Sequence, residues 1–315
     1  MVRHFVSQND LSPREIRTVF DRARQLKRTR LEPLLPGRTL VMFFEKSSTR
    51  TRLSFEAGMT QLGGHAIYLD RDSSQLSRGE SIGDTARVVS RYADLMMARV
   101  YAHATVAELG DSASIPVING LSDEEHPCQS MADLFTVLER RESLEGLRLA
   151  FVGDGNNNVT HSLMLGATML GVDMIVASPP ELRPMERYVD LARGNASRFG
   201  GSIRVTGDAR EAVRDADVIY TDVWTSMGRE ADRDRRLQLL APYQVNERLA
   251  AAARPDFLFM HCLPAHIGEE VTAEIAYGPN SVIFDEAENR LHAQKALMLL
   301  LLEWSEGERN EQRPA

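Results

Sequence analysis

Residues 46–52, KSSTRTR, place three cationic side chains and four hydroxyls directly after the apolar pentad Leu40–Phe44. The pentad, LVMFF, is typical of a buried strand, and ligands of open parallel sheets bind beyond the carboxyl ends of strands. A helix beginning near Ser48 or Thr49 would direct its free N–H groups and the positive end of its dipole to that place. Arg50 adds a guanidinium that binds phosphate oxygens in pairs. The run therefore predicts a site for a small, doubly charged anion.

The same run also has a simpler interpretation, as a capped helix with solvated charges. Arg52 and Glu56 lie four residues apart and would pair on one helix face. The stretch alone leaves both interpretations open.

A second polar stretch, HPCQ at residues 126–129, stands where a strand and a loop lead into a long helix. His126 and Gln129 can both donate hydrogen bonds to a carbonyl or an amide. Cys128, between them, has the character of a small apolar filler. A histidine at a helix start also serves as a cap or a structural partner, so this stretch does not by itself distinguish the roles.

Residues 151–162, FVGDGNNNVTHS, have the strand, glycines and helix of a dinucleotide-binding turn. The spacing differs, because asparagines follow the GxG. Ser178 stands where an NAD-binding protein offers an acid to the ribose. A nucleotide site is therefore disfavoured, and Asn157 and Asn158 suit an amino or a carboxylate group better.

Two further polar stretches follow apolar strands, DVWTSMG at residues 222–228 and FMHCLPAH at residues 259–266. The first would bring a carboxylate and backbone groups to a ligand. In the second, a thiol beside a histidine would suit a nucleophile, and two histidines would suit a metal. No third ligand is obvious nearby, which disfavours catalytic zinc. A buried cysteine at a strand end is the simpler alternative for Cys262.

Strand-like and helix-like segments alternate along almost the whole chain, which indicates parallel sheets with helices on both faces. The strand-like segments are apolar, as expected of strands buried on both sides. Predicted strands cover residues 39–44, 65–70, 94–100, 115–120, 147–155, 172–179, 202–208, 217–224, 256–264 and 281–287. Predicted helices include residues 51–64, 81–93, 105–113, 126–141, 185–199 and 245–253, one from about 158, and a final apolar helix from about Leu291.

A length of 315 residues favours two domains. The polar segment 142–147, ESLEGL, separates two sets of alternating elements. We therefore predict an α/β fold of two domains, residues 1–142 and 147–290, each a parallel sheet with helices on both faces.

The composition excludes several classes of protein. The net charge of −8 disfavours a nucleic-acid or anionic-membrane partner. The first ten residues lack the apolar core of a signal peptide, so we expect a cytoplasmic protein. Two cysteines without a CxxC pair disfavour a disulfide framework and a structural zinc site. The longest apolar run, 296–302, is far shorter than the roughly 20 residues of a membrane-spanning helix.

Four stretches, taken together and in chain order, resemble the aspartate/ornithine carbamoyltransferase family. They are FEKSSTRTRLSFE (44–56), HPCQ (126–129), DVWTSMG (222–228) and HCLPAH (261–266), and the resemblance continues to ENRLHAQKA (288–296). The first two resemble motifs shared with the aspartate enzymes, and the last two resemble the ornithine branch. The resemblance implies a carbamoyl-phosphate domain, an ornithine domain and a last helix, about 291–305, that returns to the first domain. It also implies a homotrimer, or a multiple of trimers, with active sites between subunits.

Carried over position by position, the resemblance implies two sets of site residues. The carbamoyl-phosphate set is Ser48, Thr49, Arg50, Thr51, Gln75, Arg99, His126, Gln129, Cys262, Leu263 and Arg290. The ornithine set is Asn158, Asp222, Ser226 and Met227. Catalytic roles fall to Arg50, Arg99, His126, Asp222, Cys262 and Arg290. Gln75 lies in the loop that the family lends to a neighbouring subunit. One asparagine is extra relative to the family pattern, so Asn157 and Asn158 could exchange roles.

The implied reaction is transfer of the carbamoyl group of carbamoyl phosphate to the δ-amine of L-ornithine, in arginine metabolism. Charge develops on the phosphate and on the carbonyl oxygen, so donors fixed at both are the largest expected catalytic contribution. No metal and no organic cofactor is required. The phosphate is assigned to residues 48–51 and Arg99, and the amine to Asp222 and Cys262.

Three other functions stay open at this point. A carbamoyltransferase for another amine, such as putrescine, would use the same first domain. An NAD-dependent dehydrogenase would need an acid after the strand that ends near Ser178, and none is there. A non-enzymatic anion-binding protein would keep Arg50 but would have no use for the loops at 222–228 and 261–266.

Overall fold

The computed structural model describes residues 2–225 and 232–311, and these form two compact units. The first unit comprises Met1–Met131 and Arg290–Ala315, and the second comprises Ala132–Asn289. The chain passes between the units inside α5 (Pro127–Arg141) and returns inside α12 (Ile283–Glu311). The prediction that the last helix returns to the first domain is therefore confirmed. The boundary at residues 142–147 lies in the connection from α5 to the next strand and stays a prediction.

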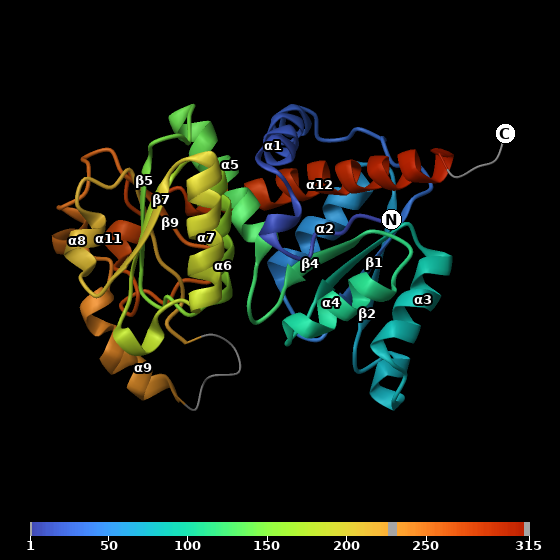
Figure 1. The fold of residues 1–315 in the computed structure, drawn as a ribbon, viewed down its shortest axis with the longest axis horizontal. Helices are drawn as coiled ribbons and strands as arrows, with labels where there is room; N and C mark the ends of the chain where they lie inside the picture. The colour runs from blue at the N-terminus through green and yellow to red at the C-terminus, as the bar shows by residue number, and fades with distance from the viewer. Residues whose placement is uncertain (1, 226–231, 312–315) are drawn as a thin grey trace. The chain divides into compact units, whose positions relative to one another are not determined.

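The sheet of the first unit is parallel and has the strand order β2-β1-β3-β4. Its strands are β1 (Thr39–Phe44), β2 (His65–Asp70), β3 (Leu95–Arg99) and β4 (Val117–Leu121). Helices α1 (Pro13–Arg28), α2 (Thr49–Gln61) and α12 lie over one face, and α3 (Ile82–Tyr92) and α4 (His103–Ser112) over the other (Figure 1).

The packing of α2 on α12 depends on a glycine. A Cβ added at Gly58 would lie 3.2 Å from the Lys295 side chain and 3.4 Å from Leu291. Because Gly58 has no side chain, the two helices approach each other closely, and α12 packs directly on α2.

The strand order reverses direction beside β1, because β2 lies on one side of it and β3 on the other. In open parallel sheets, a ligand crevice forms where the connections from two neighbouring strands leave toward opposite faces. The segments that follow β1 and β3 border this crevice. The 46–52 run and Arg99 are therefore placed at a ligand site by topology alone.

The sheet of the second unit is also parallel, with the order β7-β6-β5-β8-β9. Its strands are β5 (Arg148–Val152), β6 (Asp173–Ala177), β7 (Ser202–Thr206), β8 (Val218–Tyr220) and β9 (Leu258–Met260). Helices α6 (Asn158–Met169) and α7 (Glu186–Phe199) cover one face (Figure 1). The other face packs against short helices, which are α8 (Ala209–Val213), α9 (Arg233–Leu240), α10 (Glu247–Ala250) and α11 (Ala273–Ala276).

The switch point of this second sheet lies between β5 and β8, where the order again reverses. The segments that leave β5, β8 and β9 carry the polar stretches singled out in the sequence. Topology thus gathers residues near 153–158, 222 and 261–262 at one edge of one sheet.

The predicted fold class, two α/β domains built on parallel sheets, is confirmed. One element is wrong: residues 281–287 form no strand, and only an isolated bridge joins Ser281 to Phe259. The final helix begins at Ile283 instead of Leu291. Asp285 stands in its first turn, where a negatively charged side chain favours a helix start by interacting with the dipole. The three apolar residues before it are too few to specify a strand.

Candidate active site

The candidate anion site of the first unit is built on the junction of β1 and α2. Ser48 is the N-cap of α2, and its hydroxyl accepts a hydrogen bond from the Thr51 N–H (3.3 Å). Thr51 is buried, and its own hydroxyl accepts a hydrogen bond from the Arg99 guanidinium (3.3 Å). The helix begins at Thr49, as the sequence predicted. Hydroxyls, free helix N–H groups and a buried guanidinium therefore converge at the switch point of the sheet.

A second cluster in the first unit joins the start of α5 to α12. The side chains of His126, Gln129 and Arg290 are all buried, and Arg290 Nη1 donates to Gln129 Oε1. The same nitrogen lies 3.4 Å from His126 Nε2. Arginine can only donate, so this contact makes His126 Nε2 an acceptor. The sequence placed His126 and Gln129 on one turn and gave Arg290 only through the family resemblance, and the structure brings the three together.

His126 is held as a neutral imidazole. Burial lowers its pKa well below the ordinary value, and the positive charges of Arg290, Arg99, Lys46 and Arg50 lower it further. Both effects disfavour the protonated ring. These charges also place the anion site and the His126 cluster in one electrostatic neighbourhood. The field there is positive, as binding of a doubly charged anion requires.

Two other residues of the carbamoyl-phosphate set occupy different surroundings. Gln75 is exposed on the 3-10 helix η2 (Gln75–Arg78), which follows β2. Its assignment to a neighbouring subunit's site stays a prediction. Leu263 belongs to the second unit and has a backbone φ of 59°. Residues other than glycine rarely adopt this conformation, and those that do are often found at functional sites.

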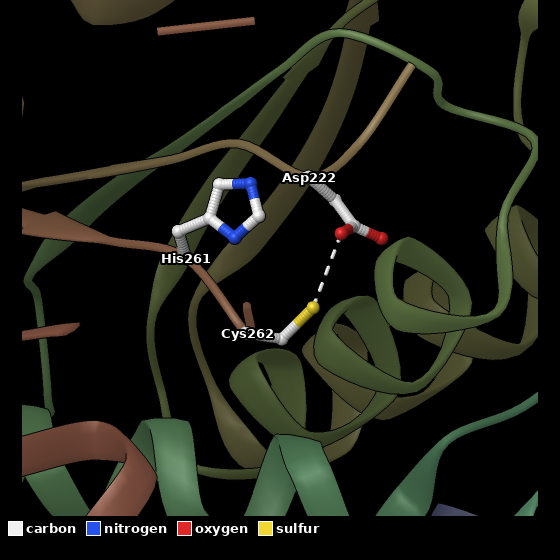
Figure 2. A group of neighbouring side chains, drawn as sticks. All are labelled: Asp222, His261 and Cys262. Atoms are coloured by element: carbon white, nitrogen blue, oxygen red, sulfur yellow. Dashed lines mark hydrogen bonds between the residues drawn. The ribbon is translucent and has the colours of Figure 1, made fainter. Parts of the chain in front are cut away.

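In the second unit, a thiol and a carboxylate meet at the ends of β8 and β9. Figure 2 shows the Cys262 thiol directed at Asp222, and its sulfur donates to Asp222 Oδ1 at 3.1 Å. Burial raises the pKa of the thiol well above its usual value, and the negative charge of Asp222 raises it further. The thiol is therefore protonated at neutral pH. A protonated thiol is a donor and a positioning group, and it is a poor nucleophile.

Two asparagines, Asn157 and Asn158, lie at the start of α6. Asn157 is the N-cap of α6, where its side-chain oxygen accepts from the Thr160 N–H (2.9 Å). Its amide nitrogen donates to Asp222 Oδ2 (3.3 Å). Both ends of the Asn157 side chain thus serve the protein itself. Asn158 begins the helix, one position further on.

His261 has a buried ring whose two nitrogens are both in use. Nδ1 accepts a hydrogen bond from the Leu263 N–H (2.9 Å), so Nε2 carries the proton and faces Glu270 Oε1 (3.2 Å). The ring therefore holds the turn that carries Cys262 and Leu263. Glu270 was not singled out by the sequence.

The sequence-based argument against a metal was wrong in one premise. A third ligand type does lie near His261 and Cys262, because Asp222 comes from the neighbouring strand, and one ligand atom of each lies within 4.8 Å of the others. However, both His261 nitrogens already form hydrogen bonds, with the Leu263 N–H and with Glu270, and the Cys262 thiol is protonated. A metal would have to displace these hydrogen bonds and remove the thiol proton.

Two residues of the ornithine set, Ser226 and Met227, lie outside the described residues. Among the described helices, none is long and apolar enough to span a membrane.

Two parallel sheets, each with polar side chains gathered at its switch point, define a two-domain α/β enzyme. Residues 3–139 match the carbamoyl-phosphate-binding domain, and residues 145–301 the Asp/Orn-binding domain, of aspartate/ornithine carbamoyltransferases. The chain belongs to the aspartate/ornithine carbamoyltransferase family, which confirms the resemblance seen in the sequence.

Individual relatives agree with the family match. The chain is 53% identical to an ornithine carbamoyltransferase of Pyrococcus abyssi, over 95% of this chain and 96% of the relative. It is 50% identical to one of Bacillus subtilis, over 98% and 96%. A solved structure of the Pyrococcus furiosus ornithine carbamoyltransferase superposes with a TM-score of 0.92 at 50% identity, covering 96% of this chain and 97% of that one.

Proposed function

We propose that this enzyme transfers the carbamoyl group of carbamoyl phosphate to the δ-amine of L-ornithine, giving L-citrulline and phosphate. The observation that carries the proposal is the pair of switch-point sites, one on each sheet. The first is cationic and rich in donors, and the second offers a carboxylate and a protonated thiol. Relatives named ornithine carbamoyltransferase at about half identity support the same reaction.

We assign the phosphate of the donor substrate to residues 48–51 and Arg99. The Ser48 cap leaves the first N–H groups of α2 directed at the anion, and Arg50 adds paired donors from the first turn. The carbonyl oxygen is assigned to Arg50, Thr51, His126 and Arg290, with Gln129 holding the carbamoyl nitrogen. A neutral His126 suits this role, because its one N–H can donate a hydrogen bond to the developing oxyanion.

The δ-amine must lose a proton before it attacks, because an alkylammonium with a pKa near ~10.4 is almost wholly protonated at neutral pH. We assign its orientation to Asp222 and Cys262. The carboxylate attracts the ammonium and accepts a hydrogen bond from it, and the thiol fixes the carboxylate in place. Asn158, Ser226 and Met227 are assigned to the α-carboxylate and α-amino groups. Asn158 is assigned here because it matches the family's ornithine-binding position.

The direct test mixes the purified protein with both substrates and measures citrulline and phosphate together. We expect equal amounts of the two products, and neither above background when ornithine is left out. Putrescine is offered in a parallel reaction, because a diamine lacks the α-carboxylate that the second site is proposed to hold. Faster formation of carbamoylputrescine than of citrulline would reassign the substrate. No phosphate release with either amine would reject the transferase.

Replacing Cys262 by serine is expected to leave measurable activity, reduced by about tenfold, the cost of one weakened hydrogen bond. The serine hydroxyl can still donate to Asp222. Loss of a covalent nucleophile would instead lower turnover by roughly 10⁴-fold or more. Steady-state rates give the first measure, and mass spectrometry of acid-quenched enzyme gives the second. A carbamoyl-thioester trapped on the unmodified protein, with abolished turnover in the serine variant, would make Cys262 the nucleophile.

We further propose that the protein works in the cytoplasm, as a homotrimer, in the biosynthetic direction. The family resemblance supports the trimer and gives exposed Gln75 a role in a neighbouring copy's site. A Pyrococcus furiosus relative, 51% identical, is named an anabolic ornithine carbamoyltransferase, which supports the direction. Light scattering that returns the mass of a single 35.2 kDa chain at assay concentrations would refute the trimer.

A further inference from the structure

Two buried acids of the second unit, Asp133 and Glu286, have no part in the chemistry assigned so far. Asp133 comes from α5 and Glu286 from the first turn of α12, and the exposed fractions of their side chains are 1% and 0%. Burial and the neighbouring Asp133 raise the pKa of Glu286 well above its usual value, which favours its protonated form.

The oxygens of Glu286 join the ends of two strands. Oε1 accepts a hydrogen bond from the Tyr220 hydroxyl (3.1 Å), and Oε2 accepts one from the His261 N–H (3.0 Å). Tyr220 is the last residue of β8, and His261 directly follows Met260, the last residue of β9. Tyr220 and Met260 are register partners. Glu286 thus spans the two strands at the point where their ladder ends.

The residues just beyond this point carry the amine-binding pair. Asp222 follows Tyr220 by two positions, and Cys262 follows His261 by one. The Thr221 N–H still reaches the Met260 carbonyl at 3.3 Å, and past it the two segments diverge into loops. The ladder therefore does not extend to Asp222 and Cys262, so their 3.1 Å spacing depends on what anchors the strand ends.

We propose that Glu286 is a positioning residue that sets the spacing of Asp222 and Cys262 by holding the ends of β8 and β9 together. The inference rests on the proposed function, because it assigns those two residues to the ornithine amine. Glu286 touches neither substrate. It acts through Tyr220 and through the peptide that precedes Cys262.

The groups that face Glu286 explain why it is held neutral. They are Asp133 from α5, Tyr220 from β8 and Cys262 from the loop after β9, and all three are acids. Burial raises the pKa of Glu286 well above its usual value, and the charge of Asp133 raises it further. A neutral carboxyl adds no negative charge beside Asp222, whose own charge is needed for the ammonium. Glutamine is neutral and of the same shape. Its oxygen can accept from the His261 N–H and its amide nitrogen can donate to the Tyr220 hydroxyl oxygen, so it should replace Glu286.

The test compares E286A with E286Q. E286A should lower kcat/KM for ornithine by roughly 10- to 100-fold, the range expected when a reacting group is misplaced by about 1 Å. The dissociation constant of carbamoyl phosphate, measured by calorimetry, should not change. E286Q should restore most of the lost rate. If E286A fails to fold, Tyr220→Phe takes its place. It removes only the hydroxyl that binds Glu286, and it should also lower kcat/KM for ornithine, by less than is expected for E286A.

The matched control is D285A, one position earlier on the same helical turn. Asp285 is partly exposed and pairs with Arg140, so its removal should leave both constants unchanged. Equal losses in E286A and E286Q would overturn the neutral positioning role. Unchanged ornithine kinetics in E286A would overturn the role altogether.

A second readout does not depend on turnover. The rate at which iodoacetamide alkylates Cys262, followed by peptide mapping, reports its contact with Asp222. Cys128 is buried and serves as an internal reference. Faster alkylation of Cys262 is expected in E286A but not in E286Q. If the unmodified chain makes no citrulline, the proposed function fails, and this readout alone still decides whether Glu286 holds the pair. Equal alkylation rates in all variants would reject that.

Discussion

The Arg50→Ala variant is expected to lose about 10²- to 10³-fold in turnover, because a donor directed at developing charge contributes about 3 kcal/mol to transition-state stabilisation. Arg50 stands in the first turn of α2, next to the Ser48 cap and the buried Thr51–Arg99 contact. From there its guanidinium can reach both the leaving phosphate and the carbonyl oxygen. The affinity for carbamoyl phosphate should fall as well. Citrulline formation at saturating substrate separates the catalytic loss from the binding loss.

Arg52→Ala is the matched control for this prediction, since it removes an arginine two positions further along the same helix. Arg52 pairs with Glu56 at 3.0 Å, and its guanidinium lies 4.4 Å from the centre of the Tyr68 ring. The Arg52 guanidinium therefore makes its contacts on the exposed face of α2. Removing this side chain should change turnover by less than about twofold, as expected for an exposed ion pair. If Arg50→Ala makes citrulline at the unmodified rate, the assignment of phosphate to residues 48–51 fails.

The sequence predicts the local structure of the first site well because its signals are local. A buried strand, an N-cap and a cationic first turn lie within residues 40–52, and the structure keeps them in that order. The start of α2 needed no knowledge of the rest of the fold. The same holds for the strand β2, which the sequence bounds at residues 65–70 as observed.

The sequence does not predict contacts that depend on strand order. Asp222 and Cys262 are forty positions apart and meet because β8 and β9 are neighbours in the sheet. Alternation of helix and strand specifies parallel sheets but not which strands adjoin. For this reason the sequence found no third ligand beside His261, and it missed Glu270 and Glu286. Such acids give no sequence signal, because in a surface helix an identical glutamate would simply be solvated.

The segment at residues 281–287 illustrates the opposite error, in which a local signal misled. Val282, Ile283 and Phe284 resemble a short strand, yet they lead into α12. A pattern of three apolar residues fits the end of a strand and the first turn of a helix equally well. Asp285 decides between them, because its negative charge favours the positive end of a helix dipole. The next residue, Glu286, is the one that reaches His261 and Tyr220.

Asp222→Asn is expected to lower kcat/KM for ornithine by about 10²- to 10⁴-fold, the usual cost of removing a group that takes part in proton transfer. The amide keeps the shape but only one oxygen, so it can accept from Cys262 or from Asn157 and not from both. It also removes the negative charge that is assigned to attract the ammonium and to receive its proton. Binding of carbamoyl phosphate, whose assigned donors lie in the first unit, should be unchanged.

The same substitution also makes a prediction of defined sign for Cys262. The negative charge of Asp222 raises the pKa of the thiol, because it disfavours a second negative charge beside it. Removing that charge lowers the pKa, so the thiolate fraction at pH 8 rises and alkylation becomes faster. Asp215→Asn, an identical change at the exposed amino end of the same strand, should alter neither quantity. Slower alkylation in Asp222→Asn would mean that the carboxylate does not raise the pKa of the thiol. Ornithine kinetics equal to those of Asp215→Asn would mean that the carboxylate does not act on the amine, and the chemistry assigned to the second sheet would need another base.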